Sequence, residues 1–135
     1  MNSQAWLEAF LSKHGGVAGS VHYLRGEFLE LAASVRLPPP VLEKTRQIPK
    51  GKGMAGLAWE RNRVVSTCNL KTDTSGDVRP GAKAVDAGAA LAIPVRDREG
   101  ELRAVLGIAF AGQREMSEAE QADFERAAQA LPGDT

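Results

Sequence analysis

The sequence predicts an α+β fold: an antiparallel sheet of about five to six strands, with the terminal helices on one face and a loop and helix region on the other. Two observations carry this prediction. Two pairs of apolar, β-type runs are each joined by a short turn, and each end of the chain has an amphipathic helical segment. Between the two pairs, residues 48–88 are glycine-rich and weakly periodic, and we expect them to cover the face opposite the terminal helices.

Composition sets outer limits on the function. The chain has 135 residues, 17 basic and 17 acidic side chains, and one cysteine. This length predicts a single domain over residues 1–135. One thiol makes no intramolecular disulfide and no multi-thiolate metal site, so we expect a cytoplasmic protein without metal or other cofactor. Balanced charge argues against nucleic-acid binding, and no apolar run approaches the roughly 18–20 residues that span a membrane.

The first three elements follow from periodicity. Residues 3–14 predict a helix that ends at Gly15-Gly16. Its apolar stripe consists of Trp6, Leu7, Phe10 and Leu11. Residues 17–24 and 27–35 predict a hairpin with a turn at Arg25-Gly26. Strict alternation places one group of side chains on a single face of the second strand: Leu29, Leu31, Ala33 and Val35. His22, in the first strand, is interpreted as a structural histidine.

The middle of the chain is less regular. Three prolines at 38–40 lead into a short helix predicted over residues 41–47. Beyond it we expect a helix over residues 54–61, a short strand over residues 64–68 and an irregular stretch around residues 73–81. A connection of about 40 mostly irregular residues is unusual in a compact domain and is more often functional.

Order returns near the C-terminus. Residues 91–95 and 102–111 predict a second hairpin, in which Pro94 requires an edge or a bulge. The second strand is apolar at nearly every position, so both of its faces should be covered. Residues 117–131 predict a helix that begins with a capping box of Ser117 and Glu120. Its apolar stripe consists of Phe124, Ala127, Ala128 and Leu131.

A glycine pattern, G-x-G-x-x-G, occupies residues 51–56. A dinucleotide-binding fold would need a buried strand just before it, and Ile48-Pro49-Lys50 is no such strand. Residues 48–60 instead resemble the central I-P-x-G-x-G-x-x-G-x-A run of GAF domains. Residues 20–34 are similar to that family's first hairpin, and residues 92–95 with 105–110 to its last strands. The resemblance covers residues 3–131.

The resemblance implies a GAF/PAS-like sheet with a pocket, in a ligand-sensing or dimerising module. Free methionine-R-sulfoxide reductase is an enzyme of this family, and its chemistry uses two thiols. One family cysteine falls at the position of Ala55, and Cys68 is the only thiol of this chain. Cys68 is followed by Asn69 rather than the histidine of bilin-binding members, and the residue set of cyclic-nucleotide-binding members cannot be assembled. The resemblance therefore implies no enzyme, and neither of these ligand classes is supported.

We expect no catalytic residue and no metal ligand. The candidate ligand-binding residues are Met54, Trp59, Cys68, Asp73, Asp77 and Ile93. Residues 43–63 carry six basic and two acidic side chains, net +4, whereas residues 115–135 carry six acidic and one basic, net −5. A solvated face, an anionic ligand or self-association would each explain this asymmetry.

The predicted function is that of a sensor of a small ligand, with an anionic molecule as one candidate. We expect this sensor to form a homodimer and to pass its signal to a protein partner. The first alternative is an interaction module with a vestigial pocket, whose terminal helices, with Trp6 and Phe10, form the dimer. The second is a methionine sulfoxide reductase-like enzyme. Neither the ligand nor the partner is specified by the sequence.

Overall fold

A computed structural model provides the structure and describes residues 2–67 and 88–133. Ten elements follow one another: α1 (Ser3–His14), β1 (Ala18–Arg25), β2 (Phe28–Val35), α2 (Pro39–Lys44), β3 (Gln47–Pro49), α3 (Gly53–Arg61), β4 (Val65–Thr67), β5 (Ala90–Arg96), β6 (Leu102–Ala109) and α4 (Glu118–Ala128). The strands form one sheet in the order β3-β2-β1-β6-β5-β4, in which every neighbouring pair is antiparallel. The predicted α+β class and the antiparallel sheet of about five to six strands are confirmed.

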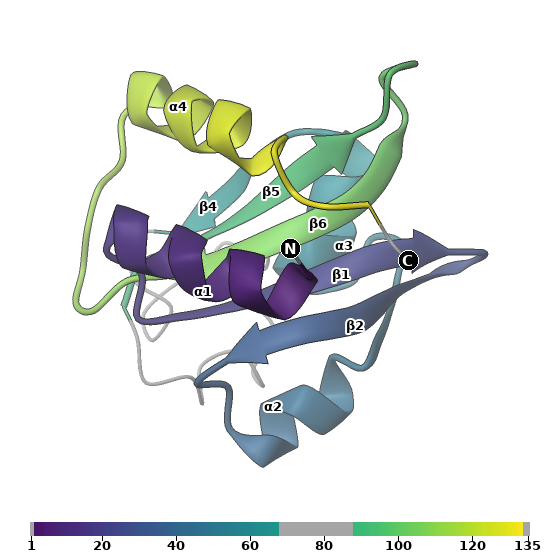
Figure 1. Cartoon of the computed structure of the whole chain (residues 1–135), viewed down its shortest axis with the longest axis horizontal. Coiled ribbons are helices and arrows are strands. Elements are labelled where there is room, and N and C mark those ends of the chain that lie inside the picture. The colour runs from purple at the N-terminus through teal and green to yellow at the C-terminus, as the bar shows by residue number, and fades with distance from the viewer. Residues whose placement is uncertain (1, 68–87, 134–135) are drawn as a thin grey trace.

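The terminal helices cover one face of the sheet (Figure 1). α1 packs on β1 and β2, and α4 packs on β5. The side chains that fill this layer are buried and alternate along each strand with residues of the opposite face. They include Leu7, Phe10 and Leu11 of α1, Phe124 and Ala128 of α4, and Val21, Ile93, Leu106 and Ile108 of the sheet.

The opposite face carries α2 and α3. α3 packs on β5 and β6, and its Ala58 is fully buried in a cluster with Ala92 and Val105. β6 therefore has apolar neighbours on both faces, as its continuous apolar run predicts. The terminal helices and α3, which belongs to the described part of the loop region, lie on opposite faces of the sheet as predicted.

Local signals account for the ends of both terminal helices. The Asn2 side chain accepts from the Ala5 amide at the start of α1, and Gly15 closes the helix at φ 75°. Ser117 and Glu120 form the predicted capping box of α4. α4 ends at Ala128 rather than at Leu131, because the following amides bond three residues back.

The first hairpin differs from the prediction in the position of its turn and in the faces of the sheet on which the β2 side chains lie. The turn is Gly26-Glu27, one residue later than expected, and Val21 pairs with Ala33 while His22 pairs with Leu31. The extra residue, Ala32, is a bulge that turns the rest of β2 over. Leu29 consequently packs with α3, whereas Ala33 packs with α1. The prediction that both lie on one face is wrong.

Three further boundaries need correction. The helix predicted over residues 41–47 is α2, Pro39–Lys44, and the residues after it form β3 against Phe28–Glu30 of β2. The strand at residues 102–111 ends at Ala109, and the strand predicted over residues 64–68 is β4, Val65–Thr67, with residue 68 outside the described residues. The sequence did not predict β3, because a strand of three residues is too short to produce a period.

Pro94 illustrates how a proline fits inside a sheet. β5 is an internal strand, but β4 pairs only with Ala90–Ala92. Pro94 lies beyond that pairing and next to a register shift at Val95/Arg96. It therefore occupies a local edge beside a bulge, as the missing amide hydrogen requires.

Candidate functional site

A cavity of about 560 Å³ lies between the sheet and the helices α2 and α3. Its floor is made of small residues that stand opposite one another on three neighbouring strands. Ser20 pairs with Gly107, which pairs with Ala92; Ala18 pairs with Ala109, which pairs with Ala90. Because these side chains project little from the sheet, the helices above them leave a hollow rather than a packed core.

The walls come from the two helices and the segment that joins them. α2 and the residues after it contribute Val41, Thr45 and Ile48, and α3 contributes Met54 and Ala55. Most of this lining is apolar. Such a surface suits a small molecule whose bulk is apolar and whose polar groups are few.

Positive charge marks the rim. Among the described residues that line the cavity, the charged ones are Lys44 and Lys52, and both are exposed. Lys52 also precedes α3, whose first turn has no acidic residue and no side-chain cap. The unpaired amides of a helix's first turn carry partial positive charge, which adds to that of the lysines.

The floor holds a hydroxyl group next to a glycine. A Cβ on Gly107 would come within 2.8 Å of the Ser20 Oγ. Any larger residue at position 107 would therefore push the hydroxyl aside and fill part of the cavity. The glycine keeps both the space and the position of this polar group.

His22 lies next to Ser20 along this face and lines the cavity with it. Its side chain is 2% exposed, and its Nε2 lies 2.7 Å from the Thr45 carbonyl oxygen. A carbonyl only accepts, so Nε2 carries the hydrogen; Nδ1 is buried without a partner among the described residues. Burial lowers the pKa of His22, and the bond to Thr45 opposes this in part. Burial therefore favours the neutral ring, and the Nε2 bond to Thr45 fixes the end of α2 to the sheet.

The predicted site residues are only partly brought together. Met54 lines the cavity. Ile93 does not: it is fully buried under the terminal helices, because its neighbour Ala92 takes the cavity side of β5. The prediction placed Ile93 on the wrong face of β5. Trp59 does not line the cavity either; it packs beside Ala58 and holds Lys50 Nζ 5.8 Å from its ring centroid. Cys68, Asp73 and Asp77 lie outside the described residues.

Sequence reasoning missed the floor of the cavity. Ser20, Ala92 and Gly107 carry no recognisable pattern of their own, and only the strand register places these small residues side by side. The basic excess of residues 43–63 was the available signal for Lys44 and Lys52. In the described part of the chain, no group of three His, Cys, Asp or Glu side chains could hold a metal ion. Nor does any helix there have the length and apolarity to cross a bilayer.

Known proteins resemble this chain in fold. A family model described as a GAF domain matches residues 4–131. The type II free methionine-R-sulfoxide reductase of Thermoplasma acidophilum is 20% identical, with a TM-score of 0.75 over 96% of this chain and 85% of that one. The GAF domain of a Coxiella burnetii phosphoenolpyruvate-protein phosphotransferase is 21% identical, with a TM-score of 0.75 over 96% and 77%.

A second reductase gives a comparable match. The free methionine-R-sulfoxide reductase of Neisseria meningitidis, solved in complex with its substrate, is 17% identical, with a TM-score of 0.75 over 96% of this chain and 72% of that one. No curated protein sequence matches the chain. At these identities the solved structures establish the fold, which enzymes and regulatory domains share.

Proposed function

This chain belongs to the GAF domain family, and from that premise we propose that it is a non-enzymatic regulatory module that binds a small organic anion in the cavity over β1, β6 and β5. The ligand's bulk lies on the small-residue floor. Its anionic group lies at the rim, near Lys44 and Lys52. Binding favours one arrangement of α2 and α3, and this population shift is passed to a protein partner.

The cavity itself carries this proposal. Its volume of about 560 Å³ falls in the range of roughly 300–1,000 Å³ typical of small-molecule sites. Cores are otherwise packed with few voids larger than a water molecule. A hollow built from six small residues in register on three strands is therefore a specific feature of this sequence.

The anionic class follows from the charges of the lining. Lys44 and Lys52 stand there with no acidic residue among the described lining. The first-turn amides of α3 reinforce them. A carboxylate, sulfonate or phosphate on a mainly apolar body has a complementary partner for each part of this surface.

Matched pairs of probes test the proposal: indole-3-acetate against indole-3-acetamide, and octanoate against octanamide. We expect a carboxylate to raise the melting temperature and its neutral amide to have a smaller effect. The double variant Lys44→Gln, Lys52→Gln should weaken carboxylate binding roughly tenfold, which is about 1.4 kcal/mol. Lys50→Gln is the matched control, because Lys50 contacts Trp59 and does not line the cavity.

The outcome that contradicts the anionic class is equal binding of each carboxylate and its amide. Native mass spectrometry of freshly purified protein extends the search beyond this panel. If no probe binds saturably and no molecule is retained, the cavity has no ligand role.

Reductase activity is the second candidate, because the structural neighbours include free methionine-R-sulfoxide reductases. We propose that this chain lacks it. Reduction of a sulfoxide by a thiolate leaves a sulfenic acid that a second thiol must resolve, and Cys68 is the only cysteine, so the chain has no resolving thiol of its own. Ala55 also stands where the resemblance places one of the enzyme's cysteines. We therefore expect no turnover of free methionine sulfoxide by the wild type or by Cys68→Ser, even with a dithiol reductant that supplies the second thiol; turnover by the wild type alone would restore the enzymatic assignment.

A dimer through the terminal helices is the remaining alternative. Two of the residues suited to such a seam are already used within the protomer: Phe10 is 6% exposed and Leu131 is 3% exposed. Trp6 is half-buried and stacks on Phe10, with ring centroids 4.9 Å apart. These burials leave less apolar surface of the terminal helices for a dimer, so we rank self-association below ligand binding.

A further inference from the structure

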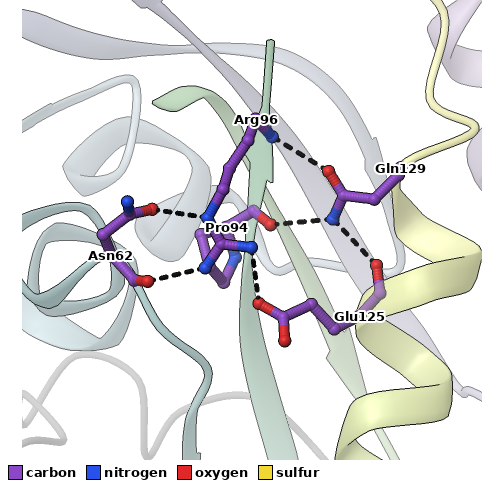
Figure 2. A network of polar contacts seen from close by, with 5 residues as sticks. All are labelled: Asn62, Pro94, Arg96, Glu125 and Gln129. Atoms are coloured by element: carbon purple, nitrogen blue, oxygen red, sulfur yellow. Dashed lines mark hydrogen bonds and ion pairs between the residues drawn. The ribbon is translucent and has the colours of Figure 1, made fainter. Parts of the chain in front are cut away.

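Arg96, the last residue of β5, holds two helices at once (Figure 2). On one side its Nε donates to Asn62 Oδ1 at 2.9 Å, and one terminal nitrogen donates to the Asn62 carbonyl oxygen at 2.6 Å. On the other side its second terminal nitrogen donates to Glu125 Oε2 at 2.8 Å. All three nitrogens of the guanidinium are used.

The two helices belong to opposite layers of the molecule. Asn62 is the C-cap of α3, in the left-handed conformation at φ 51°, and Glu125 lies in α4. α3 packs in the cluster of the cavity face and α4 in that of the terminal-helix face. Arg96 reaches both because β4 pairs with β5 only as far as Ala92, and because the register shift at Val95/Arg96 re-aims the end of the strand.

α4 has a separate attachment to the same strand. Gln129, which follows α4, accepts from the Arg96 backbone amide at 3.0 Å and donates to the Pro94 carbonyl at 3.2 Å. Neither bond involves the guanidinium. Replacing the Arg96 side chain therefore removes the link between α3 and α4 and leaves the link between β5 and α4.

The opposite end of α3 lines the cavity through Gly53, Met54 and Ala55. A helix of nine residues, about 13 Å long, moves as a unit, so a displacement at one end is felt at the other. The guanidinium transmits it because its planar fork fixes the directions of its hydrogen bonds, which a lysine ammonium would not. The side chains of Arg96 and Glu125 are each 28% exposed, so water screens the pair only in part.

We propose that Arg96 is a positioning residue that couples the α3 wall of the cavity to α4, so that a change at the cavity alters the stability of α4. This coupling rests on the proposed function only for its biological use, as the step from ligand to partner. The contacts themselves join residues of this chain alone. The proposal can therefore be tested without a ligand.

The test is native-state amide hydrogen exchange of the whole protein with and without Met54→Ala, which loosens α3 at its cavity end. In the wild-type background we expect Met54→Ala to speed exchange of the α4 amides about fivefold more than that of the α1 amides. In the Arg96→Gln background the same substitution should change both helices by one common factor. Global destabilisation alone changes α1 and α4 equally, so the comparison separates coupling from loss of stability.

Arg103→Gln is the matched control. Arg103 lies on the neighbouring strand β6 and donates to the carbonyl oxygens of Leu131 and Pro132, after α4, at 2.7 and 3.3 Å. Among the described residues its hydrogen bonds go to these two carbonyls and not to α3, so its loss should leave the selective effect of Met54→Ala on α4 intact. Asn62→Gly is a second route, because glycine keeps the left-handed C-cap and removes the side-chain acceptor; it should reduce the effect.

The proposal is overturned if Met54→Ala changes α4 selectively in the Arg96→Gln background as well, or changes α1 and α4 alike in the wild type. Either result can coexist with saturable carboxylate binding in the cavity. Conversely, selective coupling with no carboxylate binding would leave Arg96 as the link and remove only the proposed ligand. The two failures are thus distinguishable.

Discussion

His22 combines three properties that rarely coincide in one residue. It lines the cavity, it is 2% exposed, and it has one bonded and one unpartnered nitrogen among the described residues. Its sequence context gave the structural interpretation, and the Nε2 bond to Thr45 agrees with it. The unpartnered Nδ1 also makes protonation of the ring unfavourable, because a protonated ring would bury a charge without a partner.

The stability of the protein should therefore depend on pH through His22. Its native pKa lies below the ordinary value of 6.5, with burial as the main cause. Above that value both native and unfolded chains are neutral at this residue, and the full stability is present. As the pH falls below it, the unfolded chain binds a proton that the native chain resists, so the unfolding free energy falls by up to about 1.4 kcal/mol per pH unit.

His22→Gln isolates this contribution, because the amide nitrogen can still donate to the Thr45 carbonyl but does not titrate. Urea unfolding between pH 5 and pH 7 should show a flatter dependence for the variant than for the wild type. Burial and the charge of Lys13 also lower the pKa of His14. His14 is more exposed than His22, so His14→Gln should remove less of the pH dependence of the unfolding free energy. An unchanged slope in His22→Gln would show that the ring is not held neutral.

At the scale of elements, the strength of the local signal decides what can be predicted. α1, α3 and α4 have apolar stripes or caps that the sequence displays, and their predicted bounds are close to those observed. The faces of β2 could not be predicted, because the Ala32 bulge arises from pairing with β1 and leaves no local mark. Ile93 was misplaced for a related reason: apolarity alone does not show which face of a strand covered on both sides a residue occupies.

The capping box of α4 gives an element-scale prediction. The Ser117 Oγ accepts from the Glu120 amide at 3.1 Å, and the Glu120 carboxylate accepts in return from the Ser117 amide at 3.4 Å. Ser117→Ala should lower the unfolding free energy by about 1 kcal/mol. Ser12→Ala, on the exposed side of α1, should have little effect. Urea unfolding measures both variants. An equal decrease in the unfolding free energy of the two would show that the Ser117 cap does not stabilise the protein.

At the scale of the whole molecule, the GAF fold supplies a sheet with two unlike faces. One is closed by the terminal helices, and the other is left hollow by small residues in register on β1, β6 and β5. The sequence pattern was enough to predict this two-sided plan and a basic region near the site. It could not predict the floor of the cavity, because Ser20, Ala92 and Gly107 become neighbours only through strand pairing.

The central claim, a carboxylate-binding cavity on this floor, is tested most directly by a ¹H–¹⁵N nuclear magnetic resonance titration with indole-3-acetate and octanoate, each beside its neutral amide. A binding carboxylate should shift the amide signals of Ser20, Met54 and Gly107 saturably and leave those of Leu7 and Phe10, in α1 on the closed face, nearly unchanged. Saturable shifts confined to the closed face, or none with any probe, would contradict the account.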